Sequence, residues 1–240
     1  INQYNRGSAH PFNPKVVLFD MDGVLYDSMP NHAQVWMLAM KENGIKFSAK
    51  DAYATEGARG VDTVKKYAKA QLGKDLTDEE AEAIYQLKAR YFHELLPPSI
   101  FDGVRDLMQK IRNCGLKIGV VTGSGQRTLI ERLLNDFSDF LTEDQVTTAF
   151  DVKRGKPNPD PYLTGLRKAG SYAPYEGIVV ENAPLGIRSG VAAHCFTVAI
   201  NSGPLSDSSL LDEGANILFP TIRKFADNWD DLIRNLKPGF

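Results

Sequence analysis

Two aspartates lie two residues apart directly after an apolar run, and they are the first candidates for chemistry. Residues 16–19 read Val-Val-Leu-Phe, and Asp20-Met21-Asp22-Gly23 follows them. Two carboxylates this close repel each other unless one is protonated or a divalent cation lies between them. Mg²⁺ takes oxygen ligands and commonly combines one or two carboxylates with waters and phosphate oxygens. The pair therefore indicates a magnesium site suited to a phosphorylated substrate.

Other polar groups that suit such a site occur later in the chain. Glu181 and Asn182, which follow the apolar residues 177–180, supply further oxygen ligands. Lys156, in a Gly-Lys-Pro-Asn-Pro segment, supplies a positive charge, and Thr122 supplies a hydroxyl after another apolar run. The residues after this threonine offer backbone N–H groups to a phosphate, and they are Gly123 and Ser124. Together these groups describe a phosphoryl site.

Each of these motifs also has a simpler interpretation when it is taken alone. Asp-x-Asp-Gly is common in turns, and Thr-Gly-Ser is common at helix starts. Lys-Pro-Asn-Pro is typical of a rigid surface loop, and Glu-Asn suits the N-cap of a helix. All four motifs occur in order, however, and three of them follow predicted core strands. That coincidence favours phosphoryl chemistry.

The order of apolar runs and helix-like stretches predicts an α/β fold. Uninterrupted apolar runs are typical of strands that are buried on both faces of a parallel sheet. The predicted strands cover residues 16–19, 116–121, 177–180 and 195–200, with a short edge strand at 217–219. Helix-like stretches lie near them at 103–113, 126–135, 160–169 and 184–193. This alternation predicts a Rossmann-like, doubly wound parallel sheet whose strand ends carry the polar groups.

Residues 30–98 break this pattern and predict an inserted, all-helical cap. Helix starts are indicated at Ser48 and Thr77, and Gly44 is typical of the residue after a helix end. The short segments that flank the cap are natural hinges for a lid. The expected organisation is an N-terminal arm at 1–14, an α/β core at 15–29 and 99–240, and the cap at 30–98.

Composition and charge restrict the class of function. The 240 residues carry 28 Lys and Arg against 30 Asp and Glu, a formal net charge of -2. This balance argues against a nucleic acid or an anionic membrane as the main partner. No apolar run approaches the roughly 20 residues that a membrane-spanning helix needs. With two widely separated cysteines, read as buried free thiols, and no export signal at the start, we expect a cytoplasmic protein that acts on small molecules.

The combined motifs resemble those of the haloacid dehalogenase (HAD) superfamily, in the subgroup that contains β-phosphoglucomutase and small-metabolite phosphatases. The resemblance covers nearly everything from Lys15 onward and rests on segments 19–25, 121–124, 156–157 and 180–186. It implies that Asp20 is a nucleophile that forms an aspartyl phosphate and that Asp22 is the general acid/base. It also implies a phosphate contact from Thr122, charge compensation by Lys156, and Mg²⁺ held by Asp20, the Asp22 backbone carbonyl, Glu181 and Asn182.

One departure from the family pattern concerns the metal ligands. Most members have Glu-Asp where this chain has Glu181-Asn182, so a neutral side chain replaces a charged ligand. We expect Glu56, in the cap segment Thr-Glu-Gly-Ala-Arg-Gly, to compensate as a metal ligand. The cap and the Glu-Asn-Ala-Pro segment resemble inorganic pyrophosphatases in which a cap glutamate reaches the metal. The alternative is that Glu56 is a solvated loop acid, as most glutamates are.

Three further groups are candidates for substrate contacts. His32 matches a histidine that lies near the hinge in β-phosphoglucomutase-like members and orients the general acid/base, or else it is a satisfied polar residue on a helix face. Arg59 is a candidate contact for an anion. Lys65 and Lys66 are weaker candidates because they are expected on a solvated helix surface.

Three functions are consistent with these residues. The first is a Mg²⁺-dependent phosphohydrolase that acts on inorganic pyrophosphate or a sugar phosphate through an aspartyl-phosphate intermediate. The second is a β-phosphoglucomutase, which Glu56 disfavours because an acid repels the second phosphate of a bisphosphorylated sugar. The third is a non-catalytic phosphate-binding protein, which has no use for the repelling acids Asp20 and Asp22. A monomer is expected by resemblance to capped members.

Overall fold

The computed structural model describes residues 12–236, so residues 1–11 of the predicted arm lie outside the described part. Six parallel strands form one sheet in the order β3-β2-β1-β4-β5-β6. They are β1 (Val16–Phe19), β2 (Lys117–Val121), β3 (Val146–Thr147), β4 (Gly177–Glu181), β5 (Phe196–Ile200) and β6 (Ile217–Phe219). The doubly wound sheet that the sequence predicts is therefore present. Sequence reasoning missed β3, whose two residues are too short to show a periodicity.

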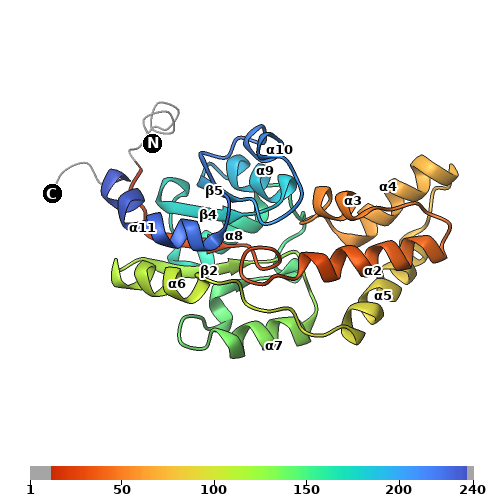
Figure 1. Ribbon diagram of the computed structural model, residues 1–240, viewed down its shortest axis with the longest axis horizontal. Coiled ribbons are helices and arrows are strands. Elements are labelled where there is room, and N and C mark those ends of the chain that lie inside the picture. Colours follow the sequence, from red (N-terminus) through yellow and green to blue (C-terminus); the bar gives the residue numbers. More distant parts are fainter. Residues whose placement is uncertain (1–11, 237–240) are drawn as a thin grey trace.

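Helices cover both faces of this sheet (Figure 1). On one face lie α6 (Val104–Asn113), α7 (Arg127–Asp136) and α11 (Ile222–Leu236), and on the other lie α8 (Asp160–Gly170), α9 (Pro184–Ala192) and α10 (Asp207–Leu211). Successive side chains of a strand point to opposite faces. Val17 and Phe19 accordingly join the apolar cluster under α6 and α11, whereas Val16 and Leu18 join the cluster under α8. Short 3-10 turns occupy Glu143–Gln145, Ala149–Asp151 and Pro174–Glu176.

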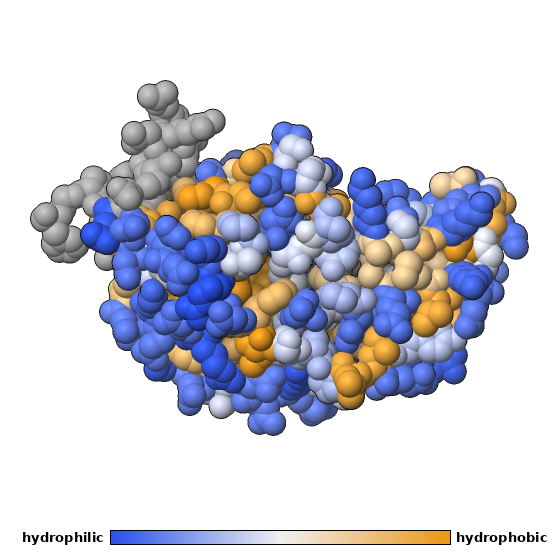
Figure 2. Space-filling view, viewed as in Figure 1, coloured by the Kyte–Doolittle hydropathy of each residue, from blue (hydrophilic) through white to orange (hydrophobic). Residues whose placement is uncertain are grey.

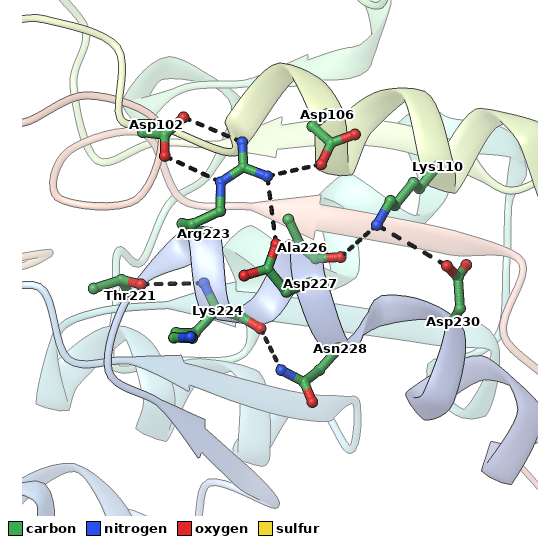
Figure 3. A network of polar contacts seen from close by, with 10 residues as sticks. All are labelled: Asp102, Asp106, Lys110, Thr221, Arg223, Lys224, Ala226, Asp227, Asn228 and Asp230. Carbon is green, nitrogen blue, oxygen red and sulfur yellow. Dashed lines mark hydrogen bonds and ion pairs between the residues drawn. The ribbon is translucent and has the colours of Figure 1, made fainter.

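Ion pairs join α6 and α11 on the outside of the core (Figure 3). The Arg223 guanidinium contacts Asp102 at 3.1 Å and Asp106 at 2.9 Å, and Lys110 lies 4.0 Å from Asp230. Exposed pairs of this kind add little stability because water screens them. The apolar contacts beneath them, including the fully buried ring of Trp229, account for most of the helix packing.

Four helices between β1 and α6 form the cap and lie together beside the core (Figure 1). They are α2 (Met29–Glu42), α3 (Ala49–Ala54), α4 (Gly60–Leu72) and α5 (Asp78–Glu94). Ser48 and Thr77 close capping boxes at the starts of α3 and α5, and Gly44 has a φ of 72° just after α2. The cap has an apolar cluster of its own, built around Trp36 and Met40.

The two chain segments that enter and leave the cap run side by side. Asp27 donates a backbone hydrogen bond to the Ser99 carbonyl at 2.9 Å, and Phe101 donates one to the Leu25 carbonyl at 3.0 Å. The cap is therefore tied to the core by a paired, narrow connection. Such a connection allows rotation of one lobe against the other.

The surface, the helices and the two cysteines can be compared with what the composition predicts. The face in Figure 2 is mostly hydrophilic, with apolar side chains gathered in smaller patches. Among residues 12–236, no helix combines the length and the apolar character needed to cross a bilayer. Cys195 is buried and Cys114 is half-buried, and both are unpaired, so the expectation of two buried thiols is wrong for Cys114.

Candidate active site

The polar groups that follow three neighbouring strands meet at one edge of the sheet. Asp20 follows β1, Thr122 follows β2, and Glu181 ends β4. Because β1 pairs with both β2 and β4, these three side chains belong to adjacent strand ends. All three are buried, with 5%, 4% and 1% of their surface exposed. The crevice at the carboxyl ends of parallel strands is where open α/β sheets bind ligands.

Lys156 reaches this edge from the loop before α8 and contacts both acids. Its Nζ lies 2.5 Å from Asp20 Oδ1, 2.7 Å from Glu181 Oε1 and 3.2 Å from the Val121 carbonyl oxygen. Burial by itself would lower the pKa of Lys156, but the two carboxylates raise it above its usual value, so the ammonium stays charged. Burial raises the pKa of Asp20, and Glu181 raises it further, against the opposing effect of Lys156.

Glu181 is fully occupied by protein donors. Its Oε1 accepts from the Tyr162 hydroxyl at 2.6 Å as well as from Lys156. Its Oε2 accepts from the backbone N–H groups of Asn182 at 3.1 Å and Ala183 at 3.4 Å. Glu181 therefore acts on the site through Lys156. A direct metal contact of the kind that the sequence predicts would first have to break one of these bonds.

Asn182 differs from its neighbour because its side-chain oxygen is free. Asn182 Oδ1 is buried and has no hydrogen-bond partner. A buried oxygen without a hydrogen-bond partner lowers the stability of the fold unless a ligand binds to it. The turn at Gly23 is shaped around this side chain, since a Cβ on Gly23 would lie 2.0 Å from Asn182 Nδ2.

The donor set fits a hard divalent cation. No three His, Cys, Asp or Glu side chains within residues 12–236 converge as a ready-made metal site. The oxygens that could bind a metal are instead the Asp20 carboxylate and the buried Asn182 Oδ1, and the family resemblance adds the backbone carbonyl of Asp22. Few protein ligands, all of them oxygens, are typical of Mg²⁺, which keeps several waters and binds substrate phosphates.

Asp22 is held by two donors on the cap side of the site. Asp22 Oδ1 accepts from Ser28 Oγ at 2.6 Å and lies 3.1 Å from His32 Nε2. Burial by itself would raise the pKa of Asp22, but His32 and Ser28 lower it to about 2. The carboxylate is therefore ionised at neutral pH and able to accept a proton. These contacts match the interpretation in which His32 orients Asp22.

Lys88 in α5 extends this network and was missed by sequence reasoning. Its Nζ lies 2.8 Å from His32 Nδ1, and it is only 3% exposed. A hydrogen bond from Lys88 to Nδ1 leaves the Nε2–H of His32 facing Asp22. Burial lowers the pKa of Lys88 to about 8. The ammonium also lies over the Phe92 ring at 5.1 Å and the Trp36 ring at 5.6 Å.

A signal for Lys88 is present in the sequence. Helical residues three or four apart share a face, so a lysine within an apolar stripe at that spacing is expected to be buried. Lys88 falls on the stripe of α5 formed by Ala81, Ile84, Tyr85, Ala89 and Phe92.

Glu56 lies in the cap loop between α3 and α4, and this loop faces the polar residues of the candidate site. It lines a cavity of about 60 Å³ together with Asp22, His32, Lys88 and Thr122. Burial raises the pKa of Glu56, and the nearby Asp22 raises it further. Glu56 is half-buried and shares this cavity with the carboxylate of Asp22. The cavity is lined by two acids, Asp22 and Glu56, and by one lysine, Lys88, and this balance favours binding of a cation.

A second, larger cavity opens beside the first. It has a volume of about 420 Å³ and is lined by Arg59, Lys156, Gln126 and the exposed ring of Phe150. Gly123 and Ser124 lie at the first cavity, and Gly123 also lines the second. The weaker candidates lie elsewhere: Lys65 pairs with Asp78, and Lys66 is exposed.

Comparison with known proteins agrees with this arrangement. The family model "haloacid dehalogenase-like hydrolase" matches residues 14–194. Hexitol phosphatase A of Escherichia coli (strain K12) is 30% identical over 188 residues, 78% of this chain and 83% of that protein. The β-phosphoglucomutase of Bacillus subtilis (strain 168) is 25% identical over 227 residues, 90% of this chain and 96% of that protein.

A solved structure extends the likeness to three dimensions. A Bacteroides vulgatus protein, provisionally named a β-phosphoglucomutase, is 45% identical with a TM-score of 0.93, covering 99% of this chain and 97% of that one. The family match covers well over half of the chain and includes all three strand ends that carry the site. The chain therefore belongs to the haloacid dehalogenase-like hydrolases and is an enzyme of their phosphatase and phosphomutase group.

Proposed function

We propose that the protein is a Mg²⁺-dependent phosphohydrolase that cleaves a small phosphorylated compound through an aspartyl phosphate on Asp20. The buried contact between Lys156 Nζ and Asp20 Oδ1, at 2.5 Å, carries this proposal. An ammonium held against a carboxylate at the end of β1 offsets charge on both the nucleophile and an incoming phosphoryl group.

The chemistry takes two steps. An Asp20 oxygen forms a bond to phosphorus while the bond to the leaving oxygen breaks. Thr122 donates its hydroxyl to a phosphoryl oxygen, and Lys156 offsets the charge. Asp22 then takes a proton from a water, whose oxygen attacks phosphorus and releases Asp20. Asp22 passes this proton to the leaving group, whose oxygen departed as an anion in the first step, and is a carboxylate again. Ser28 and His32 hold Asp22 in the orientation that this proton transfer needs.

Asp20, the Asp22 backbone carbonyl, Asn182 and Glu56 are the residues that would hold Mg²⁺. When bound, the ion screens the repulsion between these acids and the phosphate. The orphaned Asn182 Oδ1 supports this ligand set. Glu56 supports it too, because its loop faces the same cavity as Asp22.

Inorganic pyrophosphate is the substrate that the smaller cavity supports. A leaving phosphate is compact and anionic, and the 60 Å³ cavity is lined by Lys88 and His32. The acid at Glu56 repels a second phosphate unless a metal lies between them. A cap carboxylate that binds the metal therefore suits a substrate with two adjacent phosphates.

A sugar phosphate is the second candidate, and the larger cavity favours it. Its volume of about 420 Å³ exceeds what a leaving phosphate occupies, and Arg59 lines it. The similarity to a hexitol phosphatase and to a β-phosphoglucomutase supports the same candidate. In this case the reaction is either hydrolysis or transfer of the phosphoryl group within the sugar.

A substrate panel with Mg²⁺ tests these alternatives. Pyrophosphate, hexose phosphates and β-glucose 1-phosphate with its bisphosphate activator are compared for phosphate release and for isomerised sugar phosphate. Release supports hydrolysis, and isomerisation without release supports the mutase. Asp20→Asn should reduce turnover at least about 1,000-fold, as removal of a nucleophile does. Asp27→Asn, at an exposed carboxylate close by, is the control. Turnover of Asp20→Asn at the native rate would contradict both enzyme functions.

A further inference from the structure

Tyr162 lies beneath the catalytic lysine and takes no part in the chemistry described so far. It belongs to the first turn of α8, six residues after Lys156. Its ring is fully buried among Leu18, Val121 and Val179, so its position is set by the sheet. Only its hydroxyl points toward the polar cluster, where it donates to Glu181 Oε1 at 2.6 Å.

The hydroxyl and the ring of Tyr162 act on two members of that cluster. The hydroxyl shares Glu181 Oε1 with Lys156 Nζ, which lies 2.7 Å from the same oxygen. The ring lies beneath the ammonium, whose Nζ is 5.3 Å from the ring centroid. Burial raises the pKa of Tyr162 well above its usual value, so the hydroxyl keeps its proton and remains a donor.

Two carboxylates compete for the ammonium of Lys156. Asp20 Oδ1 and Glu181 Oε1 both accept from its Nζ, and both are buried. A hydrogen bond to a charged group is a strong one. When Tyr162 donates to Glu181, it offsets part of that charge and weakens the pull of Glu181 on the lysine. Without this donor, the ammonium is expected to move toward Glu181 and away from the nucleophile.

We propose that Tyr162 is a positioning residue, which holds Glu181 so that Lys156 faces Asp20 and the phosphoryl group it receives. It acts through Glu181 and Lys156 and does not touch the substrate. The inference rests on the proposed aspartyl-phosphate chemistry. It goes beyond that chemistry because none of the proposed steps uses the buried Tyr162 hydroxyl that donates to Glu181.

The first experiment replaces only the donor. Tyr162 is exchanged for 4-aminophenylalanine, which keeps an N–H donor at the same place, and for 4-methylphenylalanine, which fills the same volume without a donor. We expect the methyl variant to lose about 10- to 100-fold in kcat, in the range of residues that orient a catalytic group, with KM changed less than about threefold. The amino variant should stay within about threefold of the wild type. Equal kcat values for the two variants, whether high or low, would overturn the proposal.

The second experiment needs no turnover. Trifluoroberyllate with Mg²⁺ imitates a phosphoryl group on an aspartate, and its dissociation constant is measured by fluorine NMR. The methyl variant should bind it at least about tenfold more weakly than the amino variant, because Lys156 no longer faces the mimic. Unchanged binding would overturn the role of Tyr162 alone. Failure of the wild type to bind trifluoroberyllate would overturn the proposed function itself.

A double-mutant cycle tests the route through Glu181. Tyr162→Phe is measured alone and in a Glu181→Gln background, where the carboxylate charge is gone. Coupled residues give non-additive effects, so Tyr162→Phe should change kcat less than about threefold in that background. If Tyr162→Phe lowers kcat by the same factor in both backgrounds, the proposal is overturned. Tyr172→Phe, which removes a hydroxyl from a ring packed on the same apolar cluster, is the control and should leave kcat unchanged.

Discussion

The backbone of Gly57 in the cap lies against the side chain of Lys156 in the core. A Cβ on Gly57 would lie 3.1 Å from Lys156 Cδ and 3.8 Å from the backbone nitrogen of Gly186. Gly57 also has a φ of 85°, which few residues other than glycine adopt. The cap loop therefore reaches Lys156 directly, and the closeness of this approach depends on a residue without a side chain.

Gly57→Ala should hinder closure of the cap over the substrate. The added methyl contacts the stem of Lys156, so we expect kcat/KM to fall about tenfold or more, as expected when a lid cannot close fully. Gly73→Ala is a matched control, because Gly73 is also in the cap and has a φ of 66°, but a Cβ there meets nothing within 4 Å. Both variants carry a similar backbone strain of about 1 kcal/mol. Equal activity of the two variants would show that the contact with Lys156 has no effect.

Asn182→Asp should strengthen Mg²⁺ binding. The substitution places a charged oxygen where the orphaned amide oxygen lies, and affinity for hard cations rises with the charge of the ligands. We expect the Mg²⁺ concentration for half-maximal activity to fall about tenfold. Asn228→Asp, an exposed position on α11, adds the same charge away from the site. An unchanged or higher Mg²⁺ requirement would show that residue 182 is not a metal ligand.

Glu56→Gln should have the opposite effect. The amide keeps the size of the side chain but removes its charge, so the half-activating concentration of Mg²⁺ should rise about tenfold or more. Glu79→Gln, at an exposed position in α5, is the control within the cap. If the metal dependence of Glu56→Gln equals that of the wild type, Glu56 does not bind the metal.

Lys88 should make stability depend on pH in the alkaline range. Its pKa is about 8 in the folded protein, below the ordinary value of 10.5. Between these values the unfolded chain binds more protons at this lysine than the folded chain does, so stability rises with pH. The difference of about 2.5 pKa units corresponds to about 3 kcal/mol. The free energy of unfolding of the wild type minus that of Lys88→Met should grow by up to this amount from pH 8 to pH 10.5.

Urea denaturation of the two proteins across this range measures the difference. Other groups that titrate there are common to both chains and cancel in the subtraction. A flat or falling difference would mean that Lys88 does not have a lowered pKa in the folded state.

Much of the fold could be predicted because its strands and helices have local signatures. Predominantly apolar runs identified β1, β2, β4 and β5, and the Thr77 capping box identified the start of α5. Strand ends gave the positions of Asp20 and Thr122, because the carboxyl ends of neighbouring parallel strands meet at one edge of the sheet. The two-residue β3 carries no such signature.

Side-chain partners required the folded structure. The sequence suggested both Glu181 and Asn182 as metal ligands, with Asn182 as a neutral one. In the structure Glu181 accepts from four protein donors, whereas Asn182 Oδ1 has none. Two of those donors, Tyr162 and Lys156, are 19 and 25 residues away in the sequence, and no local pattern couples them to Glu181.

The sequence by itself determined which groups lie at the carboxyl edge of the sheet, because periodicity and capping are properties of neighbouring residues. Only the tertiary structure decided that Glu56, Lys88 and Tyr162 join them. Those three come from a cap loop, a cap helix and the first turn of α8, and packing of one element against another brings them to the site. The burial that results gives these groups the shifted pKa values that local sequence does not encode.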